Sequence, residues 1–377
     1  MSEHFFITGG TGLVGTALLP RILASWPDCT VTVLIRADDE QTKEVRLRDI
    51  VARLRQEGIP HASERVSVLW GDVGVEDLGL RSEQREDIIR TATHLIHGAA
   101  TTRFDHPLEE ARAINCGGTM RMIRLAQESV DRGRLKRMVY IGSSSVSGQR
   151  GGDIYEHELE MGQPFFNTYE HSKNESERLV RDYFDRVPAT VFRPSIIIGD
   201  SRTGWTSSFN VIYIPLRLLH KGLLKYVPGT PSTKMDLVPI DWVSASMVHI
   251  MKNDESVGKV FHQTAGPKRA ATLGEVVLSA IEYFDRNAPL SSPRAMEFID
   301  RVEYERRRAV MRGREEALMS QLDTLLPYVS VDRLFDSRNS DALMEGSGIV
   351  FPLFRDYAER IFAFCLKTNW GKVGIAA

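Results

Sequence analysis

A glycine-rich turn close to the N-terminus constrains the fold of this chain more than any other feature. The apolar run from residue 4 to residue 8 leads into glycines spaced G-x-x-G-x-x-G, and an apolar helical pattern follows over residues 17–23. A strand, a turn and a helix in this order suit a pyrophosphate, because glycine lets the backbone come close and the helix N-terminus offers unpaired N–H groups to an anion. We therefore expect a dinucleotide to bind at Thr8, Gly9, Thr11, Gly12, Leu13, Val14 and Gly15. A plain strand-to-helix turn is the alternative, and the rest of the chain must decide.

The alternation of strand-like and helix-like segments predicts the fold class. Four further apolar or β-branched runs lie at residues 29–35, 66–70, 94–97 and 137–141, with charged amphipathic stretches between them. This pattern predicts an α/β fold of the Rossmann type, in which helices cover both faces of a doubly wound parallel sheet. Because ligands of such sheets bind beyond the carboxyl ends of the strands, candidate site residues should follow each strand directly.

The residue after the second strand bears on the choice of cofactor. Arg36 lies 21 positions beyond Gly15, where an acidic side chain would accept hydrogen bonds from the 2′-hydroxyl of NAD. A cation at this place suits a 2′-phosphate instead, so the sequence favours NADPH. The alternative is a solvated arginine at a strand end, and Asp38 and Asp39 follow closely.

Small and polar residues follow the third and fourth strands. Asp72 and Val73 could meet the adenine, although an aspartate in a polar loop is just as often a turn former. Gly98, Ala99 and Ala100 would let the backbone approach a flat or phosphorylated ligand. Taken alone, Asn115 in the following helix is a packed polar residue and His97 a hydrogen-bonded core histidine.

The residues after the fifth strand indicate the chemistry. Ser143, Ser144 and Ser145 follow that strand, and Tyr169 and Lys173 lie four residues apart, hence on one face of a later helix. A reductase must protonate the oxygen that forms when hydride reaches a carbonyl carbon. Tyrosine, with a reference pKa of about 10, becomes a usable acid when a neighbouring cation stabilises its phenolate. Lys173 can supply that charge, and a serine hydroxyl can hold the substrate oxygen.

Composition excludes several classes of protein. The 48 basic and 50 acidic residues leave a net charge of −2, which argues against nucleic-acid binding. Three cysteines at scattered positions predict a reducing cytoplasm, with neither a disulfide frame nor a metal site. A strand within the first few residues leaves no room for a signal peptide, and no apolar run approaches the ~18 residues of a membrane span.

The length of 377 residues favours one large or two unequal domains. We expect a NADP-binding Rossmann domain over residues 1–200 and about 235–265, and a smaller, mostly helical substrate-binding region over residues 201–234 and 266–377. Within the second region, residues 205–219 are apolar and fit either a core helix or a surface for an acyl chain.

The last hundred or so residues predict further elements. Residues 258–264 resemble a late strand, Thr272-Leu273-Gly274-Glu275 opens an amphipathic helix, and 294–325 is a charged stretch of helical character. Its arginines at 306–308 form either a solvated helix face or a phosphate contact. The aromatic stripe of the final helix, residues 354–365, either packs on the main domain or contacts a membrane surface peripherally.

With these motifs in place, the sequence resembles the extended short-chain dehydrogenase/reductases, and within them the fatty acyl-CoA reductase and thioester reductase branch, also called the male-sterility type. The resemblance covers roughly residues 4–265. It rests on the following motifs: Thr8-Gly9-Gly10-Thr11-Gly12-Leu13-Val14-Gly15; Ala100-Thr101-Thr102-Arg103-Phe104-Asp105 leading to Asn115 and Gly118-Thr119; Tyr169 with Lys173; Arg193-Pro194-Ser195-Ile196-Ile197-Ile198-Gly199; Gly204-Trp205; and Met235-Asp236-Leu237-Val238-Pro239-Ile240-Asp241-Trp242-Val243.

The resemblance implies roles for individual residues. Tyr169 would be the proton donor and Lys173 its partner, which also contacts the cofactor. Ser143 would be the family's serine, with Ser144 as the alternative one residue on. Asn115 would help to place the lysine through water. Pro194, Ser195 and Ile196 would line the nicotinamide end of the cofactor.

The activity implied by the resemblance is NADPH-dependent reduction of an acyl thioester, carried on coenzyme A or a carrier protein, to an aldehyde and with a second hydride to an alcohol. A homodimer is implied as well. The alternatives are a ketone or aldehyde reductase, a sugar-type or sterol-type dehydrogenase with the same catalytic residues, and a non-catalytic NADPH sensor.

Overall fold

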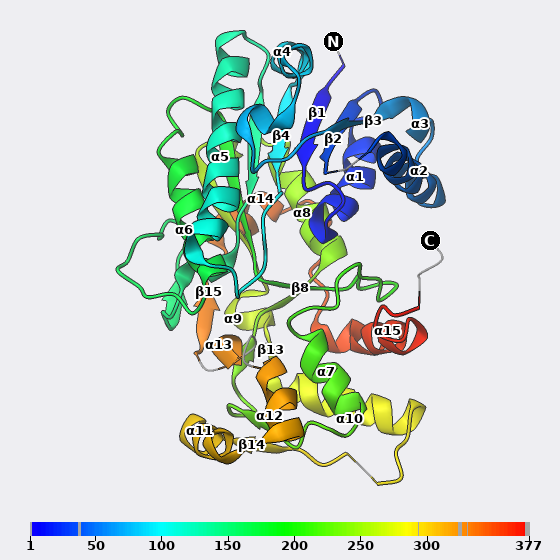
Figure 1. Cartoon of the computed structure of the whole chain (residues 1–377), viewed down its shortest axis with the longest axis vertical. Helices are drawn as coiled ribbons and strands as arrows, with labels where there is room; N and C mark the ends of the chain where they lie inside the picture. Colours follow the sequence, from blue (N-terminus) through cyan, green and yellow to red (C-terminus); the bar gives the residue numbers. More distant parts are fainter. Residues whose placement is uncertain (1, 37–38, 293, 323–325, 330, 374–377) are drawn as a thin grey trace.

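A parallel sheet forms the upper part of the molecule in a computed structural model that describes residues 2–36, 39–292, 294–322, 326–329 and 331–373 (Figure 1). Within the described residues the sheet has seven strands in the order β12-β7-β5-β4-β1-β2-β3. The strands are β1 (His4–Thr8), β2 (Thr30–Ile35), β3 (Val66–Trp70), β4 (His94–His97), β5 (Arg137–Ile141), β7 (Ala189–Pro194) and β12 (Lys259–Gln263). The expected α/β fold of the Rossmann type is confirmed, and each strand predicted from the sequence is present.

Helices cover both faces of the sheet. The elements are α1 (Leu13–Ser25), α2 (Glu40–Gln56), α3 (Ala62–Arg65), η1 (Glu76–Gly79), α4 (Ser82–Thr91), α5 (Leu108–Asp131), η2 (Ser144–Ser147), α6 (Thr168–Arg181), α8 (Ile240–Met251) and η3 (Asp254–Ser256). Because side chains alternate along a strand, Phe5 and Ile7 face one hydrophobic cluster with α1 and α8, whereas Phe6 faces another with α4, α5 and α6. Burial on both faces explains why the strands are almost continuously apolar.

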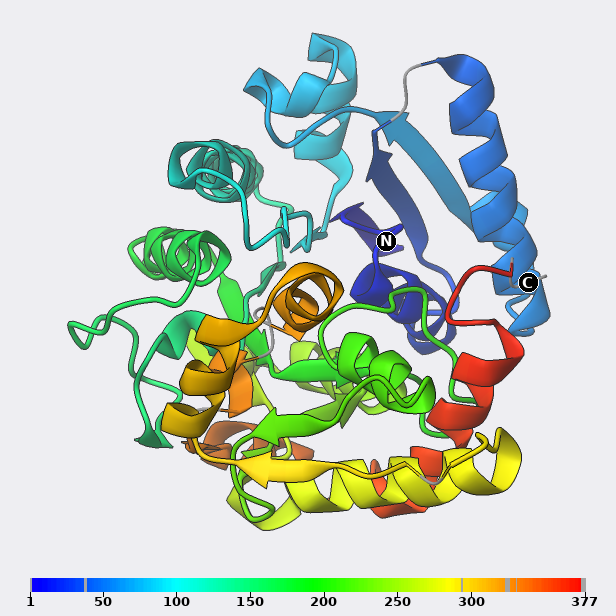
Figure 2. The ribbon, with the colours of Figure 1, turned by 60° about the horizontal axis from the view of Figure 1, so that its bottom comes forward.

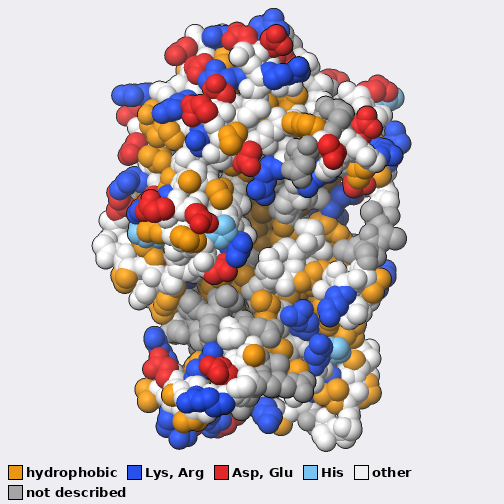
Figure 3. Space-filling view, in the orientation of Figure 1, with side chains coloured by type: hydrophobic (Ala, Val, Ile, Leu, Met, Phe, Trp, Pro, Cys, Tyr) orange, Lys and Arg blue, Asp and Glu red, His pale blue; other side chains and the backbone are white. Residues whose placement is uncertain are grey.

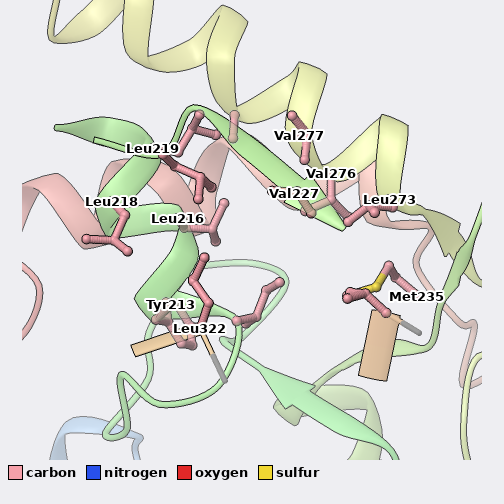
Figure 4. Packing of buried hydrophobic residues seen from close by; sticks show 14 of the residues in the cluster. Tyr213, Leu216, Leu218, Leu219, Val227, Met235, Leu273, Val276, Val277 and Leu322 are labelled. Atoms are coloured by element: carbon pink, nitrogen blue, oxygen red, sulfur yellow. The ribbon is translucent and has the colours of Figure 1, made fainter. Parts of the chain in front are cut away.

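A third hydrophobic cluster fills the lower part of the molecule. It is formed by residues between Ile198 and Trp370, chiefly from α7 (Tyr213–His220), α10 (Leu273–Asn287) and α15 (Phe354–Lys367). Figure 4 shows residues of α7 and α10 pointing toward one another, with Leu216 and Val276 among them. Helices α10 and α15 pack together (Figure 2). The apolar stretch over residues 205–219 thus contains a core helix, as one of its two interpretations predicts.

Short elements complete the lower part. These are β6 (Gly152–Ile154), β8 (Ile196–Ile198), β9 (Tyr226–Pro228), β10 (Lys234–Met235), β11 (Leu237–Pro239), α9 (Gly266–Arg269), β13 (Ala271–Thr272), β14 (Glu297–Ile299), α11 (Arg301–Val310), α12 (Gly313–Met319), η4 (Ser320–Leu322), α13 (Leu326–Val329), β15 (Arg333–Phe335) and α14 (Arg338–Met344). Strand β15 pairs with β6 in parallel, and α14 packs against α8 and β12. The C-terminal segment therefore returns to the sheet. The division into two domains with the bounds given above stays a prediction.

The charged stretch predicted as helical over residues 294–325 differs from that expectation. It contains β14, α11 and α12; α11 ends at Val310, where Met311 is extended, and α12 begins at Gly313, which has a φ of +61°. Leu325 lies outside the described residues. Arg306 and Arg307 pair with Glu303 on their own helix, as a solvated helix face would.

The aromatic stripe of α15 faces inward. Tyr357, Ile361, Phe362 and Cys365 are buried in the third cluster. Packing on the rest of the protein is therefore the interpretation that the structure supports for this stripe. A search of the described residues finds no helix long and apolar enough to span a membrane.

Candidate active site

The glycine turn lies at the carboxyl end of β1, in the middle of the sheet. Gly9 has a φ of +75°, and a Cβ atom placed on it would lie 2.5 Å from the carbonyl carbon of Gly98 at the end of β4. A Cβ atom on Gly15 would lie 2.3 Å from the Gly9 carbonyl oxygen. These close approaches require glycine, because they bring the start of α1 against the turn and the turn against β4.

The same turn leaves room for a ligand in front of the helix. Helix α1 starts after Gly12, and among the described residues no side chain caps its first N–H groups. Leaving aside its chain neighbours, a Cβ atom on Gly12 would have a single described heavy atom within 4 Å. This atom is the Gly9 carbonyl oxygen, at 3.3 Å. The unpaired N–H groups and the open space fit the pyrophosphate of a dinucleotide. Thr8, Thr11, Leu13 and Val14 lie in or beside this turn.

The other residues predicted to bind the cofactor follow neighbouring strands. Arg36 is exposed directly after β2, and Asp38 lies outside the described residues. Asp72 follows β3, and its Oδ1 accepts a hydrogen bond of 2.7 Å from the N–H of Gly74. That bond forms a turn, as one of the two interpretations of Asp72 expects, and it engages one carboxylate oxygen. Val73 is buried against Gly118 of α5.

Gly98, Ala99 and Ala100 leave β4 beside the glycine turn. The N–H of Gly98 donates to the Thr8 carbonyl oxygen at 3.0 Å, which joins the ends of β4 and β1. Strands β2 and β3 lie on one side of β1, and β4 lies on the other. The strand order therefore reverses between β1 and β4, and open α/β sheets bind their ligands at such a switch point. Near the middle of the face in Figure 3, the surface is hollowed between the sheet part and the lower helical part.

Ser143 and Tyr169 meet beyond the end of β5. Ser143 precedes the short helix η2, and its hydroxyl lies 2.7 Å from that of Ser145. Tyr169 belongs to the first turn of α6, which Asn167 caps. Burial raises the pKa of Tyr169, and a hydrogen bond with the Ser143 side chain acts against that rise. The contact with Tyr169 favours Ser143 over the alternative Ser144.

Lys173 lies one turn after Tyr169 on α6 and is buried. Its Nζ donates a hydrogen bond of 2.9 Å to the Ile141 carbonyl oxygen at the end of β5 and lies 4.3 Å from the centre of the Tyr140 ring. Burial lowers the pKa of Lys173 to about 7, although the negative charge of Glu177 raises it. The ammonium group is thus held at the end of β5, one helical turn from Tyr169 on α6.

Asn115 joins α5 to the loop after β4 and to α6. Its Oδ1 accepts from the Thr101 N–H at 2.8 Å, and its Nδ2 donates to the Ser172 hydroxyl at 2.9 Å. The side chain therefore fixes the loop beside the helix that carries Tyr169 and Lys173. His97 is a hydrogen-bonded core histidine as predicted, 2.8 Å from the Thr8 hydroxyl, and burial lowers its pKa to about 3.

The predicted nicotinamide-end segment lies at the exit of β7. Pro194 ends β7 and Ile196 begins β8, while the Ser195 hydroxyl donates to Asp236 Oδ1 at 2.5 Å. The Ser195 side chain is thus engaged with a buried carboxylate. Sequence analysis did not single out Tyr140, which lies on the Lys173 side of β5. The alternation of side chains along β5 indicates on which face of the sheet Tyr140 lies, but not its contact with Lys173.

The fold and the site define a class of protein. The protein has a parallel sheet, a glycine turn at the switch point of that sheet, and a Ser-Tyr-Lys group at the next strand end. These features are typical of a dinucleotide-binding oxidoreductase of the extended short-chain dehydrogenase/reductase type. The sequence profile described as male sterility protein matches residues 7–247. The chain belongs to this family, which confirms the resemblance seen in the sequence.

Several known proteins are similar to this chain. It is 27% identical over 318 residues to fatty acyl-CoA reductase wat of Drosophila melanogaster, covering 74% of this chain and 60% of the relative. It is 30% identical over 271 residues to nonribosomal peptide synthetase asaC of Aspergillus flavus, covering 68% of this chain and 26% of the relative. The matched regions are thus less than two thirds of the length of these relatives.

A solved structure supports the fold. The terminal R domain from the myxalamid PKS-NRPS biosynthetic pathway superposes with a TM-score of 0.81 at 24% identity, covering 99% of this chain and 92% of that domain. The similarity extends over the lower helical part as well as the sheet.

Proposed function

We propose that this protein is an NADPH-dependent reductase that converts an acyl thioester to an aldehyde, with Tyr169, Lys173, Ser143 and Asn115 as its catalytic group. The observation that carries the proposal is the meeting of Ser143, Tyr169 and Lys173 at the end of β5, beside the glycine turn. The fatty acyl-CoA reductase and the nonribosomal peptide synthetase among its relatives support a thioester as the substrate.

The residues at hand would bind NADPH along the ends of β1 to β4. The glycine turn from Thr8 to Gly15 would hold the pyrophosphate, Arg36 the 2′-phosphate, and Asp72 and Val73 the adenine. The stretches 98–100 and 194–196 would approach the nicotinamide half. Bound NADPH supplies the hydride for the reaction.

Residues of the chain bind and protonate the carbonyl oxygen of the substrate. Ser143 donates a hydrogen bond to the thioester carbonyl oxygen, and Tyr169 transfers its hydroxyl proton to that oxygen as negative charge develops. The ammonium group of Lys173 stabilises the phenolate that remains. Asn115 keeps the loop after β4 fixed against α6. The resulting hemithioacetal then collapses: its hydroxyl proton returns to the Tyr169 phenolate, its C–S bond breaks, and the sulfur leaves as a thiolate that takes a proton from water, which leaves the aldehyde.

Several finer features belong to the same proposal. The three free cysteines, Cys29, Cys116 and Cys365, support a cytoplasmic location. Coenzyme A or a carrier protein would present the acyl group, and the resemblance to dimeric reductases supports a homodimer. We place the substrate-binding region in residues 201–234 and 266–377.

The substitution Tyr169→Phe tests the proposal at its proton donor. Because the ring stays and the hydroxyl is lost, we expect turnover to fall by a factor of roughly 10² or more while the affinity for NADPH stays within about twofold. Turnover is measured by NADPH absorbance with acyl-CoA, and affinity by NADPH fluorescence. Tyr155→Phe, at a half-buried tyrosine that follows β6, is the matched control and should retain wild-type turnover. A Tyr169→Phe protein with full turnover would contradict the mechanism.

A further inference from the structure

A buried carboxylate that the proposed mechanism does not use lies directly behind the catalytic group. Glu177 is one helical turn after Lys173 on α6, and its side chain is 0% exposed. Arg193 of β7 donates to both of its oxygens, from Nε to Oε2 at 2.8 Å and from Nη2 to Oε1 at 2.8 Å. Arg181 donates a further hydrogen bond to Oε1 at 2.9 Å. A forked arginine contact with an additional cation is among the strongest arrangements for an ionised carboxylate.

The arginines keep Glu177 charged despite its burial. Burial acts to raise the pKa of Glu177, but the charges and hydrogen bonds of Arg193 and Arg181 outweigh that effect, so the pKa lies below its usual value. At neutral pH the group therefore places a fixed negative charge inside the protein.

This charge lies next to the strand end that binds Lys173. The Lys173 ammonium donates to the Ile141 carbonyl oxygen, and the following residue, Gly142, borders Glu177: a Cβ atom on Gly142 would lie 3.4 Å from Oε2. Ser143 comes next in the chain. Lysine and carboxylate thus approach consecutive residues of the segment that leads to the catalytic serine.

The other titratable groups around Lys173 are uncharged at neutral pH. They are Tyr169 on α6, Tyr140 on β5, Cys116 on α5 and His97 on β4. Burial raises the pKa of both tyrosines and of the cysteine, and it lowers the pKa of the histidine. Beyond Glu177 lie the positive charges of Arg193 and Arg181. Among these groups Glu177 alone is negative, so it is the counter-charge to a buried ammonium group.

We propose that Glu177 is a positioning residue that raises the protonated fraction of Lys173 at neutral pH, and that Arg193 and Arg181 serve this role by keeping Glu177 ionised. The protonation of Lys173 is a property of the fold itself, while its consequence for turnover rests on the proposed function. Burial lowers the pKa of Lys173, and with the charge of Glu177 acting against burial the pKa lies at about 7. Without the carboxylate most of the lysine would be neutral at pH 7 and unable to stabilise a Tyr169 phenolate.

A direct titration of Lys173 tests the inference without any substrate. The protein is labelled with lysine carrying ¹³C at Cε, and the NMR signal of Lys173 is assigned by its loss in Lys173→Met. We expect the midpoint of this signal in Glu177→Gln to lie lower than in the wild type by roughly one pH unit or more, as loss of a nearby opposite charge predicts. An unchanged midpoint would overturn the proposal.

A matched control separates this effect from general damage to α6. Glu175→Gln removes a carboxylate two residues away that pairs with Arg112 on α5. The Lys173 midpoint should stay at its wild-type value in this variant. A shift as large as that in Glu177→Gln would show that the effect is not specific to Glu177 and would also overturn the proposal.

Loss of Glu177 leaves the buried Arg193 and the half-buried Arg181 without their carboxylate, and Glu177→Gln could fail to fold for that reason. The double variant Glu177→Gln with Arg193→Met then takes its place, since it removes both partners of the strongest contact. We expect a lower midpoint here as well, because Glu177 acts on the pKa of Lys173 and Arg193 is not among the groups that do. The same variants are assayed with whichever carbonyl compound the wild type reduces. As the pH is raised, their kcat/KM should fall at a lower pH than that of the wild type, because Lys173 loses its proton earlier. Absence of wild-type turnover would contradict the proposed function but leave the titration valid.

Discussion

Gly15 shows at the scale of one residue how the fold shapes the proposed cofactor site. Its lack of a side chain brings the first turn of α1 to the Gly9 carbonyl oxygen, so that the helix N-terminus faces the end of β1. The spacing of the glycines predicts this position, because a strand, a turn and a helix in this order leave few alternatives.

The substitution Gly15→Ala should weaken NADPH binding at least tenfold, about 1.4 kcal/mol. The added methyl group would lie 2.3 Å from the Gly9 carbonyl oxygen and must move the turn or the helix. NADPH fluorescence titration measures the affinity. Gly117→Ala on α5 is the control, since its methyl group would meet the far end of the flexible Arg121 side chain. Equal affinity in Gly15→Ala and the wild type would show that the close approach does not matter for binding.

Other residues of the site could be predicted only in part. Tyr169 and Lys173 follow from their helical spacing after a serine-rich strand end. The link from Lys173 to Tyr140 and the charge of Glu177 could not be predicted, because both depend on how α6 lies against β5 and β7. The Ser195 hydroxyl binds Asp236, a partner 41 residues away, and no local pattern indicates such a contact.

Helix α10 shows at the scale of an element that local signals predict helix ends well. Thr272 accepts a hydrogen bond from the Glu275 N–H at 3.1 Å, and the Glu275 carboxylate accepts one from the Thr272 N–H at 2.7 Å. This capping box satisfies two N–H groups that the helix leaves unpaired. The predicted opening of a helix at Thr272 is thus confirmed. The stretch 294–325 is harder to predict, since its charged residues suit a helix but it contains the strand β14 and a break between α11 and α12, where Met311 is extended.

The substitution Thr272→Ala should lower the free energy of unfolding by about 1 kcal/mol, the usual contribution of a helix cap. The side chain would no longer accept the hydrogen bond from Glu275. Urea unfolding followed by circular dichroism gives the difference. Thr272→Ser keeps the hydroxyl group and should remain close to the wild type, and an equal loss in both variants would assign the effect to the methyl group instead.

The whole molecule consists of a sheet and a lower helical part. Each strand and helix of the sheet part has its own pattern in the sequence, whereas the lower part is built from segments that lie far apart along the chain. The third hydrophobic cluster collects residues from Ile198 to Trp370, and β15 crosses back to pair with β6. The class of the sheet could be predicted because each strand and helix carries its own pattern. The pairing of residues 333–335 with 152–154 could not, since nothing in either stretch specifies a partner so far along the chain.

Of the residues proposed as catalytic, Ser143 follows β5, and Tyr169 and Lys173 lie in the first half of α6, at the carboxyl end of the sheet. The glycine turn and the end of β5 belong to the sheet, and the acyl group of a substrate would have to enter from the side of the helical part. The hollow seen between the two parts lies where such a substrate would approach (Figure 3).

Turnover of acyl-CoAs tests the proposal that this protein reduces acyl thioesters with NADPH. Purified protein is given NADPH with medium and long acyl-CoAs, the matching aldehydes and a few ketones, and mass spectrometry identifies the products. The proposed function predicts NADPH consumption with acyl-CoA, release of free thiol and formation of an aldehyde or alcohol. Consumption with aldehydes or ketones alone, and none with any acyl thioester, would contradict it.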